Sequence, residues 1–513
     1  MTSWSEGYVS DIAYSIGYYR EMAPDHVGYA ALSLGKHPGG AVKPKRVLEL
    51  GFGMGLGFVL GAAANPQTEF EGCDFNPEHI MHARALAEGA GLTNVTIREA
   101  SFQELAAEAR EGQHDCDIIQ LHGILTWVSD DAHRAIVEIA RKRLKPGGLL
   151  YVSYNCMPGW APMLPVRRYM LDQARVTSGN SMQKTAAAVQ SLRAMMAGNA
   201  RFFAANPQLE QRVERLGSMS MSYLPHEYLN QHWHIFHVAD VAEMFGQAKL
   251  TFVGSATIAE NIDGVSVPAE MREMVAQATD PIWKETLRDI AGNKQFRRDL
   301  YARGVIALNG SETLRRLHDT RFTLAMPRSA ISFKLPSLLG ELDAKPEIYG
   351  AIADRLAEEI VPFDAIVTLP ELKEVGTGGT LQALALMIHA GQVLPILGEI
   401  ETDHAPAQRL NRILADAATN GRIYGFLAAP AMRAGLPATS TEMFMLSAIF
   451  AGKESDPPQI ALQVHDILKR LGISLNREGK PIIDPAELQQ TLAQEVRTFL
   501  DEKLTLWKRL GAV

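Results

Sequence analysis

The stretch "RVLELGFGMGLGFVL", residues 46–60, constrains the fold of this chain more than any other. An apolar run at 46–50 predicts a buried strand, and residues 57–64 predict a helix. Four glycines, Gly51, Gly53, Gly55 and Gly57, lie between or at the edge of the two. A strand, a glycine turn and a helix in this order are typical of the opening of a doubly wound α/β sheet.

The glycine spacing excludes two common nucleotide sites. A dinucleotide fingerprint requires G-x-G-x-x-G, but the sixth position counted from Gly51 is Leu56. A P-loop requires a lysine after its last glycine, and no lysine lies between Arg46 and Arg84. Glu49, directly before the turn, would repel a pyrophosphate and favours a cationic ligand.

A second acid narrows the choice of ligand. Residues 69–74 predict a strand that ends at Asp74, which follows Gly55 by 19 residues and can accept both hydroxyls of a ribose. S-adenosylmethionine (SAM) fits this set, because its sulfonium and α-amine are cationic and it carries no phosphate. The plain alternative is that the glycines only allow a helix and a strand to pack closely.

The following residues continue the alternation of strands and helices. Strands are expected at 94–99, 115–125, 149–155 and 250–256, with an amphipathic helix at 130–144, which indicates a parallel sheet covered on both faces. After the third strand, Ser101 is expected to hydrogen-bond the adenine and Phe102 to pack on it. The predicted fold class is α/β, with a Rossmann-like sheet.

Composition excludes several other classes. The 513 residues carry 50 basic and 58 acidic side chains, a formal charge of −8, which argues against a nucleic-acid partner. Three separated cysteines and no signal-like start predict a reduced, cytoplasmic protein. The most apolar later stretch, 381–397, is interrupted by His389, Gly391 and Pro395, so no membrane span is expected.

Several blocks resemble class I SAM-dependent methyltransferases that carry a methyltransferase regulatory domain, and in particular rickettsial protein lysine methyltransferases. The blocks are "GYYREMAP" (17–24), "ELGFGMGLGF" (49–58), "CDFNPEH" (73–79), "LHGILTWVSDDAHR" (121–134), "LYVSYNCMPGWAPMLPVR" (150–167), "YLPHEYLN" (223–230) and "NKQFRRDLY" (293–301). The resemblance covers roughly residues 10–335. It implies a SAM site and an N-terminal helix, holding Tyr18 and Tyr19, that folds over it. The predicted cofactor residues are Glu49, Gly51, Phe52, Gly53, Gly55, Asp74, Phe75, Ser101, Phe102, Gln120 and Tyr19.

Methyl transfer mainly requires proximity, alignment and exclusion of water, so a compact catalytic motif is not needed. A lysine acceptor adds one requirement: its amine has a pKa of about 10.4, and aromatic walls that desolvate it would favour the neutral, reactive form. The strand ends supply the candidates for the acceptor side, namely Trp127, Tyr154 and Asn155, together with His122 as a proton acceptor, a SAM contact or a structural histidine. Trp160 is as well explained by packing.

The stretch "HEYLNQHWHIFH" holds His226, His232, His234 and His237. This run lacks a usual zinc spacing, and no metal is predicted. Residues 363–397 have a winged-helix-like rhythm without basic residues on the second helix, which favours protein contact or a homodimer over DNA. Four domains are expected. The first two are an N-terminal helical cap (1–45) and a methyltransferase domain (46–260) with a helical insertion (about 158–235). A helical regulatory domain (261–335) with a solvated Arg297-Arg298 pair follows, and a winged-helix-like, helical C-terminal domain (336–513) ends the chain.

The sequence thus favours a SAM-dependent methyltransferase acting on a protein lysine, with the C-terminal domains presenting the substrate. A small-molecule, glycan or lipid-precursor O- or N-methyltransferase stays open, as does a SAM-binding regulator without turnover.

Overall fold

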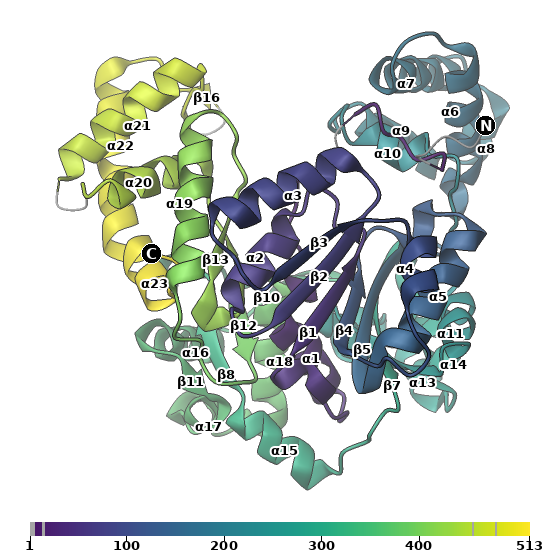
Figure 1. The fold of residues 1–513 in the computed structure, drawn as a ribbon, viewed down its shortest axis with the longest axis horizontal. Coiled ribbons are helices and arrows are strands. Elements are labelled where there is room, and N and C mark those ends of the chain that lie inside the picture. The colour runs from purple at the N-terminus through teal and green to yellow at the C-terminus, as the bar shows by residue number, and fades with distance from the viewer. Residues whose placement is uncertain (1–5, 13–15, 454–455, 478–479) are drawn as a thin grey trace.

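The computed structural model describes residues 6–12, 16–453, 456–477 and 480–513. Its centre is a sheet made of β1 (Arg46–Leu50), β2 (Glu69–Asp74), β3 (Val95–Glu99), β4 (Cys116–Leu121), β5 (Leu144–Asn155), β6 (Leu250–Ser255) and β7 (Phe296–Arg303). The spatial order is β3-β2-β1-β4-β5-β7-β6 (Figure 1). The strands β1 to β5 pair in parallel, and β7 is antiparallel to both of its neighbours. The predicted α/β, Rossmann-like class is confirmed.

Helices cover both faces of this sheet, because successive strand residues point to opposite sides. On one face Val47 and Tyr151 pack with α1, α2 and α3, and on the other Leu48 and Val152 pack with α4, α5 and α11. Their bounds are α1 (Pro24–Ser33), α2 (Leu56–Ala64), α3 (Pro77–Gly89), α4 (Phe102–Glu108), α5 (Asp130–Arg143) and α11 (Val238–Gly246). The described residues contain no helix that is both long and apolar enough to cross a membrane.

The N-terminal segment differs from the expected helix at Tyr18 and Tyr19. Tyr19 is extended, with φ −122° and ψ 106°, and a single 3-10 turn at Arg20–Met22 follows it. Ala23 precedes Pro24 and is also extended, because a residue before proline is disfavoured in the helical region. The helix therefore begins only at Pro24, and the two tyrosines lie in the non-helical segment that precedes it.

The residues expected to form the insertion fold as five helices with a core of their own, which includes Met170, Leu192 and Val213. Trp160 belongs to this core, where its ring meets that of Trp233 edge-to-face. The insertion helices lie apart from the C-terminal helices in Figure 1. They are α6 (Leu164–Val176), α7 (Ser181–Ala197), α8 (Arg201–Ala205), α9 (Gln208–Leu216) and α10 (Leu224–Tyr228).

The sheet does not end near residue 260, as the expected domain boundary implied. Strand β7 inserts between β5 and β6, and Arg297, expected on a solvated helix face, is fully buried in it. Its guanidinium pairs with Glu285 at 2.7 Å, Asp289 at 2.5 Å and Asp299 at 2.9 Å. Because the segment is rich in charged residues, its sequence resembles an exposed polar segment although it forms a buried strand. The surrounding helices are α12 (Asp263–Ser266), α13 (Arg272–Gln277), α14 (Pro281–Gly292) and α15 (Gly310–Asp319).

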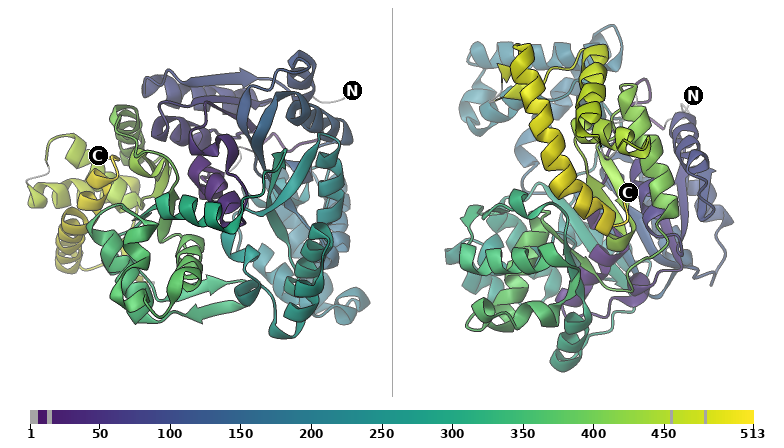
Figure 2. Two further views of the ribbon diagram at one scale, coloured as in Figure 1. Left: turned by 90° about the horizontal axis from the view of Figure 1, so that it is seen from below. Right: turned by 90° about the vertical axis from the view of Figure 1, so that its left-hand side faces the viewer.

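The C-terminal third forms two groups of elements (Figure 2). The first combines a three-stranded sheet, in the order β11-β8-β12, with a hairpin and three helices. Its members are β8 (Arg321–Leu324), β9 (Lys334–Ser337), β10 (Gly340–Asp343), α16 (Pro346–Glu358), β11 (Val361–Pro362), α17 (Phe363–Val367), α18 (Gly376–His389) and β12 (Val393–Ile396).

The second group packs on the catalytic sheet's helices α2 and α3 and shares their core. Trp507, near the end of the chain, is buried within it, so the amphipathic stretch expected at 484–510 packs on its own chain. That stretch consists of two helices joined by a π-helical segment, Phe499–Leu504. The group contains α19 (Ala405–Thr419), β13 (Phe426–Ala429), β14 (Ala434–Pro437), α20 (Ser440–Phe450), α21 (Pro457–Leu471), β15 (Asn476–Arg477), β16 (Lys480–Pro481), α22 (Pro485–Thr498) and α23 (Thr505–Arg509).

Candidate cofactor and acceptor site

The glycine turn after β1 forms the floor of a deep pocket at the carboxyl ends of the strands. Gly51 and Gly55 have φ of +71° and +74°, in the left-handed region that favours glycine. A Cβ would lie 2.4 Å from the Ile124 side chain at Gly51 and 2.6 Å from Ala83 at Gly55. These positions therefore require glycine for both conformation and close packing, and Gly55 leads directly into α2.

Asp74 fastens this turn from the end of β2. One carboxylate oxygen accepts a hydrogen bond from the Gly53 N–H at 2.9 Å. The other accepts one from the Asn76 N–H at 2.9 Å and lies 3.1 Å from His79 Nδ1. Asp74 is almost fully buried and lines the pocket, so its position relative to the turn is fixed.

Glu49 and Gln120 form a second polar pair in the pocket wall. Gln120 Nε2 donates to Glu49 Oε2 at 2.9 Å, across the β1–β4 register that aligns the two residues. Burial raises the pKa of Glu49 from 4.5 to about 7; Gln120 lowers it and Asp74 raises it. Gln120 Oε1 is buried and has no hydrogen-bond partner among the described residues, so the pair offers a carboxylate and a further acceptor to a cationic donor.

The predicted adenine contacts are present in part. Phe75 and Phe102 line the pocket, and the Phe75 ring meets Tyr8 edge-to-face. Ser101 lines it too, but its hydroxyl caps α4: it accepts from the Glu104 N–H at 3.2 Å and donates to the Glu104 carboxylate at 2.9 Å. The expected hydrogen bond from Ser101 to a base competes with this capping box.

His122 and Tyr19 lie together on the opposite wall of the pocket. Their rings stack with centroids 3.6 Å apart, and His122 Nδ1 is 2.8 Å from the Tyr151 hydroxyl. Burial, assisted by Arg298, lowers the pKa of His122 to about 3. The imidazole is therefore neutral at physiological pH and too weak a base for proton abstraction, which leaves it as a SAM contact or a packing group in the pocket wall.

Tyr154 and Asn155 do not line this pocket, contrary to their predicted place at the acceptor. Side chains alternate along β5, and Tyr154 points to the face packed by α11, where its ring contacts Phe236. Its hydroxyl donates to Asp299 at 2.5 Å, and burial raises its pKa far above the ordinary value. The Asn155 side chain lies close enough to Glu227 to lower the pKa of its carboxyl.

Every other predicted site residue lines the pocket, including Phe52 and Trp127. The predicted set omits pocket residues from three segments, and only the N-terminal one carries a hint in its local sequence pattern. The aromatic composition near the start was the one available hint, since Tyr8 joins Tyr18 and Tyr19 here. The missed lining residues include Tyr8, Met22, Ile124, Ser129, Arg433 and Ala434.

Comparisons with known proteins agree with this architecture. Residues 47–148 match a family model described as a methyltransferase domain, and residues 220–303 match a predicted methyltransferase regulatory domain, whose range spans the inserted strand β7. An uncharacterized protein of Synechocystis, sll1526, is 32% identical over 99% of both chains. A Rickettsia prowazekii protein, RP028, is 25% identical over 36% of this chain and 73% of its own length.

Among solved structures, PKMT2 from Rickettsia typhi in complex with AdoHcy aligns with a TM-score of 0.72 and 19% identity, over 95% of this chain and 98% of that one. This likeness shows a common fold over nearly the whole length. The turn, its two carboxylates and the family matches lead to one identification. The chain belongs to the class I SAM-dependent methyltransferases that carry a methyltransferase regulatory domain.

Proposed function

We propose that this methyltransferase modifies the side-chain amine of lysine in a protein substrate. The observation that carries the proposal is Glu227, a partly buried carboxylate close enough to the Tyr19 ring of the pocket to raise its pKa. The full-length likeness to PKMT2 supports the same assignment.

The residues of the pocket fit SAM. Glu49 and the free Gln120 oxygen would accept hydrogen bonds from its ammonium group, and Asp74 would accept them from the ribose hydroxyls. Backbone N–H groups of the glycine turn, at the start of α2, suit its carboxylate. Phe75 and Phe102 would flank the adenine. When bound, SAM supplies an electrophilic methyl group on a sulfonium.

The acceptor side is built around the Tyr19 ring. Arg298, Glu227 and Glu21 all lie close enough to influence its pKa. Arg298 and Arg20 both lower the pKa of Glu21, so the charge of Glu21 is largely offset, whereas the side chains that lower the pKa of Glu227 are uncharged. Glu227 then remains as the carboxylate that attracts a lysine ammonium.

Glu227 also suits removal of the lysine proton. Burial raises its pKa to about 7, although the hydrogen bond from Tyr223, at 2.5 Å, and the nearby Asn155 side chain lower it. A base with a pKa near the working pH is suited to accepting a proton. Transfer from an amine with a pKa of about 10.4 still costs about 4.6 kcal/mol at pH 7, a cost that the aromatic surroundings of Tyr19 and Trp127 would reduce by desolvating the cation.

A labelling experiment with the purified full chain tests this function. SAM labelled in its methyl group is incubated with a cell lysate, and protein, lipid and small-molecule fractions are separated. We expect label in protein, recovered as methyllysine after hydrolysis, and none with Asp74→Ala. Glu227→Gln should bind SAM normally in calorimetry and lower turnover by about 100-fold. Label confined to the other fractions would refute the lysine assignment.

Arg298 favours a second candidate, a small acceptor that carries an acid group. Its Nε is buried, and no group of residues 6–12, 16–453, 456–477 or 480–513 hydrogen-bonds it; its guanidinium lies 5.0 Å from the centre of the Phe296 ring, which packs beside His122. A carboxylate would satisfy that donor. This alternative predicts label in the small-molecule fraction, sharply reduced in Arg298→Lys.

A further inference from the structure

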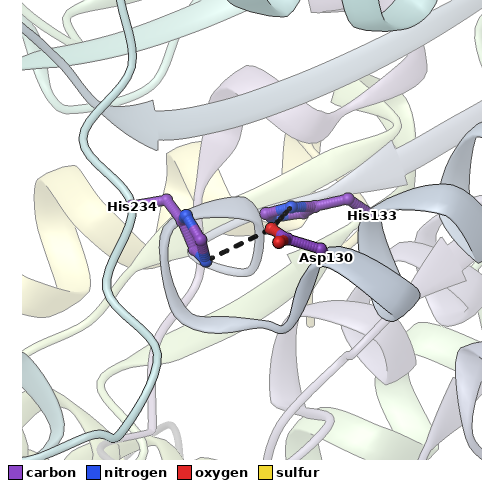
Figure 3. A group of neighbouring side chains, drawn as sticks. All are labelled: Asp130, His133 and His234. Atoms are coloured by element: carbon purple, nitrogen blue, oxygen red, sulfur yellow. Dashed lines mark ion pairs between the residues drawn. The ribbon is translucent and has the colours of Figure 1, made fainter.

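Three side chains outside the cofactor pocket converge on one point (Figure 3). Asp130 begins α5, His133 follows one turn later, and His234 lies in the loop that leads to α11. An Asp130 carboxylate oxygen is 3.7 Å from His133 Nδ1 and 3.8 Å from His234 Nε2. One ligand atom from each residue lies within 4.8 Å of the other two.

Hydrogen bonding fixes which ring atoms are free. His133 Nε2 is 2.8 Å from the Leu125 carbonyl oxygen, so it carries the hydrogen and leaves the Nδ1 lone pair directed at Asp130. Histidines that bind metals commonly donate their other N–H to a carbonyl in this way. Within the part of the chain that the structure describes, the buried His234 Nε2 has no hydrogen-bond partner, since its 3.8 Å separation from Asp130 is too long for a hydrogen bond.

We infer that Asp130, His133 and His234 form a site for one divalent transition-metal ion of the zinc class. Two imidazole nitrogens and one carboxylate, with water in the fourth position, are a common zinc ligand set. Magnesium and calcium prefer ligand sets made entirely of oxygen. The sequence did not indicate this site, because the His234 run lacks a zinc spacing and its partners are about 100 residues away.

The site joins two parts of the molecule. The backbone N–H of His234 donates to the Thr126 carbonyl at 2.7 Å. Trp127 and Ser129, which follow Thr126 in the chain, line the cofactor pocket. His234 follows the helical insertion directly. A bound ion would therefore fix the end of the insertion to α5 beside the pocket. This inference does not depend on the identity of the methyl acceptor.

Metal titration of the full chain tests the site. After chelator treatment, we expect one equivalent of Zn²⁺ to bind and Co²⁺ to give the visible absorption of a nitrogen- and oxygen-ligated ion, without competition from Mg²⁺. Asp130→Asn and His234→Gln should each weaken Zn²⁺ binding at least 100-fold. In both variants, added Zn²⁺ should no longer raise the midpoint temperature of thermal unfolding.

Two substitutions nearby serve as matched controls. Asp131→Asn removes the next carboxylate, which pairs with Arg134, and His237→Asn removes an imidazole from the same loop but retains a residue suited to capping α11. Both should bind Zn²⁺ like the wild type. Circular dichroism and SAM affinity verify that every variant is folded. The inference fails if the wild type takes up no Zn²⁺, or if the controls lose as much affinity as the ligand variants.

Discussion

Glu49 and Asp74 are both buried carboxylates, but their partners give them different chemistry. Two backbone N–H groups donate to Asp74, whereas Glu49 has one side-chain amide donor and a pKa raised to about 7. Hydrogen bonds from donors stabilise an ionised carboxylate, and burial without them favours the protonated form. Glu49, whose pKa is raised, can therefore exchange a proton when a cation binds, whereas the hydrogen bonds of Asp74 hold the glycine turn in place.

We therefore predict proton release when SAM binds near pH 6. Free Glu49, with a pKa of about 7, is about 90% protonated at that pH, and a bound ammonium would lower its pKa. Calorimetry in two buffers with different ionisation enthalpies should reveal close to one proton released per SAM. The SAM amine is already protonated at pH 6 and contributes little. Glu49→Gln should abolish the release; an unchanged release would assign it to another group.

Tyr154→Phe should reduce stability and spare the reaction. The change removes a hydrogen bond to the buried Asp299, which keeps Arg297 as a partner. We expect a loss of about 1–2 kcal/mol in the free energy of unfolding, measured in urea. SAM affinity and kcat should stay close to those of the wild type. A large fall in kcat with normal stability would restore Tyr154 to the acceptor site.

At the scale of elements, the sequence predicts what neighbouring residues encode. The glycine turn, its acids and the first strands follow from local pattern, and the pocket contains every cofactor residue predicted from them. Strand β7 was missed because its arginines resemble a solvated surface. Tyr154 was misplaced for a related reason: the end of a strand is visible in sequence, but which face a residue takes depends on register.

The buried Arg297 should be essential to β7. Its guanidinium pairs with three carboxylates, from Glu285, Asp289 and Asp299, and the side chain is fully buried. Removing one partner of a buried ion network leaves uncompensated charge, so Arg297→Ala should lower the free energy of unfolding by about 3–5 kcal/mol. Urea denaturation measures this loss of stability. Arg134→Ala, at an exposed pair, is the control and should cost less than about 1 kcal/mol; equal losses would contradict a special role for β7.

At the scale of the whole molecule, the C-terminal third is part of the cofactor pocket and not an appendage. Arg433, between β13 and β14, and Ala434 line the pocket some 380 residues after the glycine turn. The Arg433 side chain donates to Asp25 at 3.1 Å, to Asn65 at 3.0 Å and to the Val42 carbonyl at 2.9 Å. Such long-range contacts leave no local signal in the sequence.

The Arg433–Asp25 pair yields a prediction with a defined pH dependence. Burial raises the pKa of Asp25 from 3.8 to about 6; Arg433 limits this rise most, and a hydrogen bond from the Leu397 backbone limits it further. An acid whose pKa is raised on folding contributes stability at low pH that is lost as the pH increases through the folded-state value. Without Arg433 the folded-state pKa rises further, so ionised Asp25 becomes more costly above pH 6.

Arg433→Ala should therefore destabilise the protein by about 3–5 kcal/mol at pH 8 and clearly less at pH 5, where Asp25 is largely protonated with or without its partner. Urea unfolding at both pH values measures the difference. In the background of Asp25→Asn, whose amide does not ionise, the same substitution should cost equal amounts at the two pH values. A pH dependence that persists in this background would mean that another acid, and not Asp25, is the partner that joins the C-terminal third to the catalytic domain.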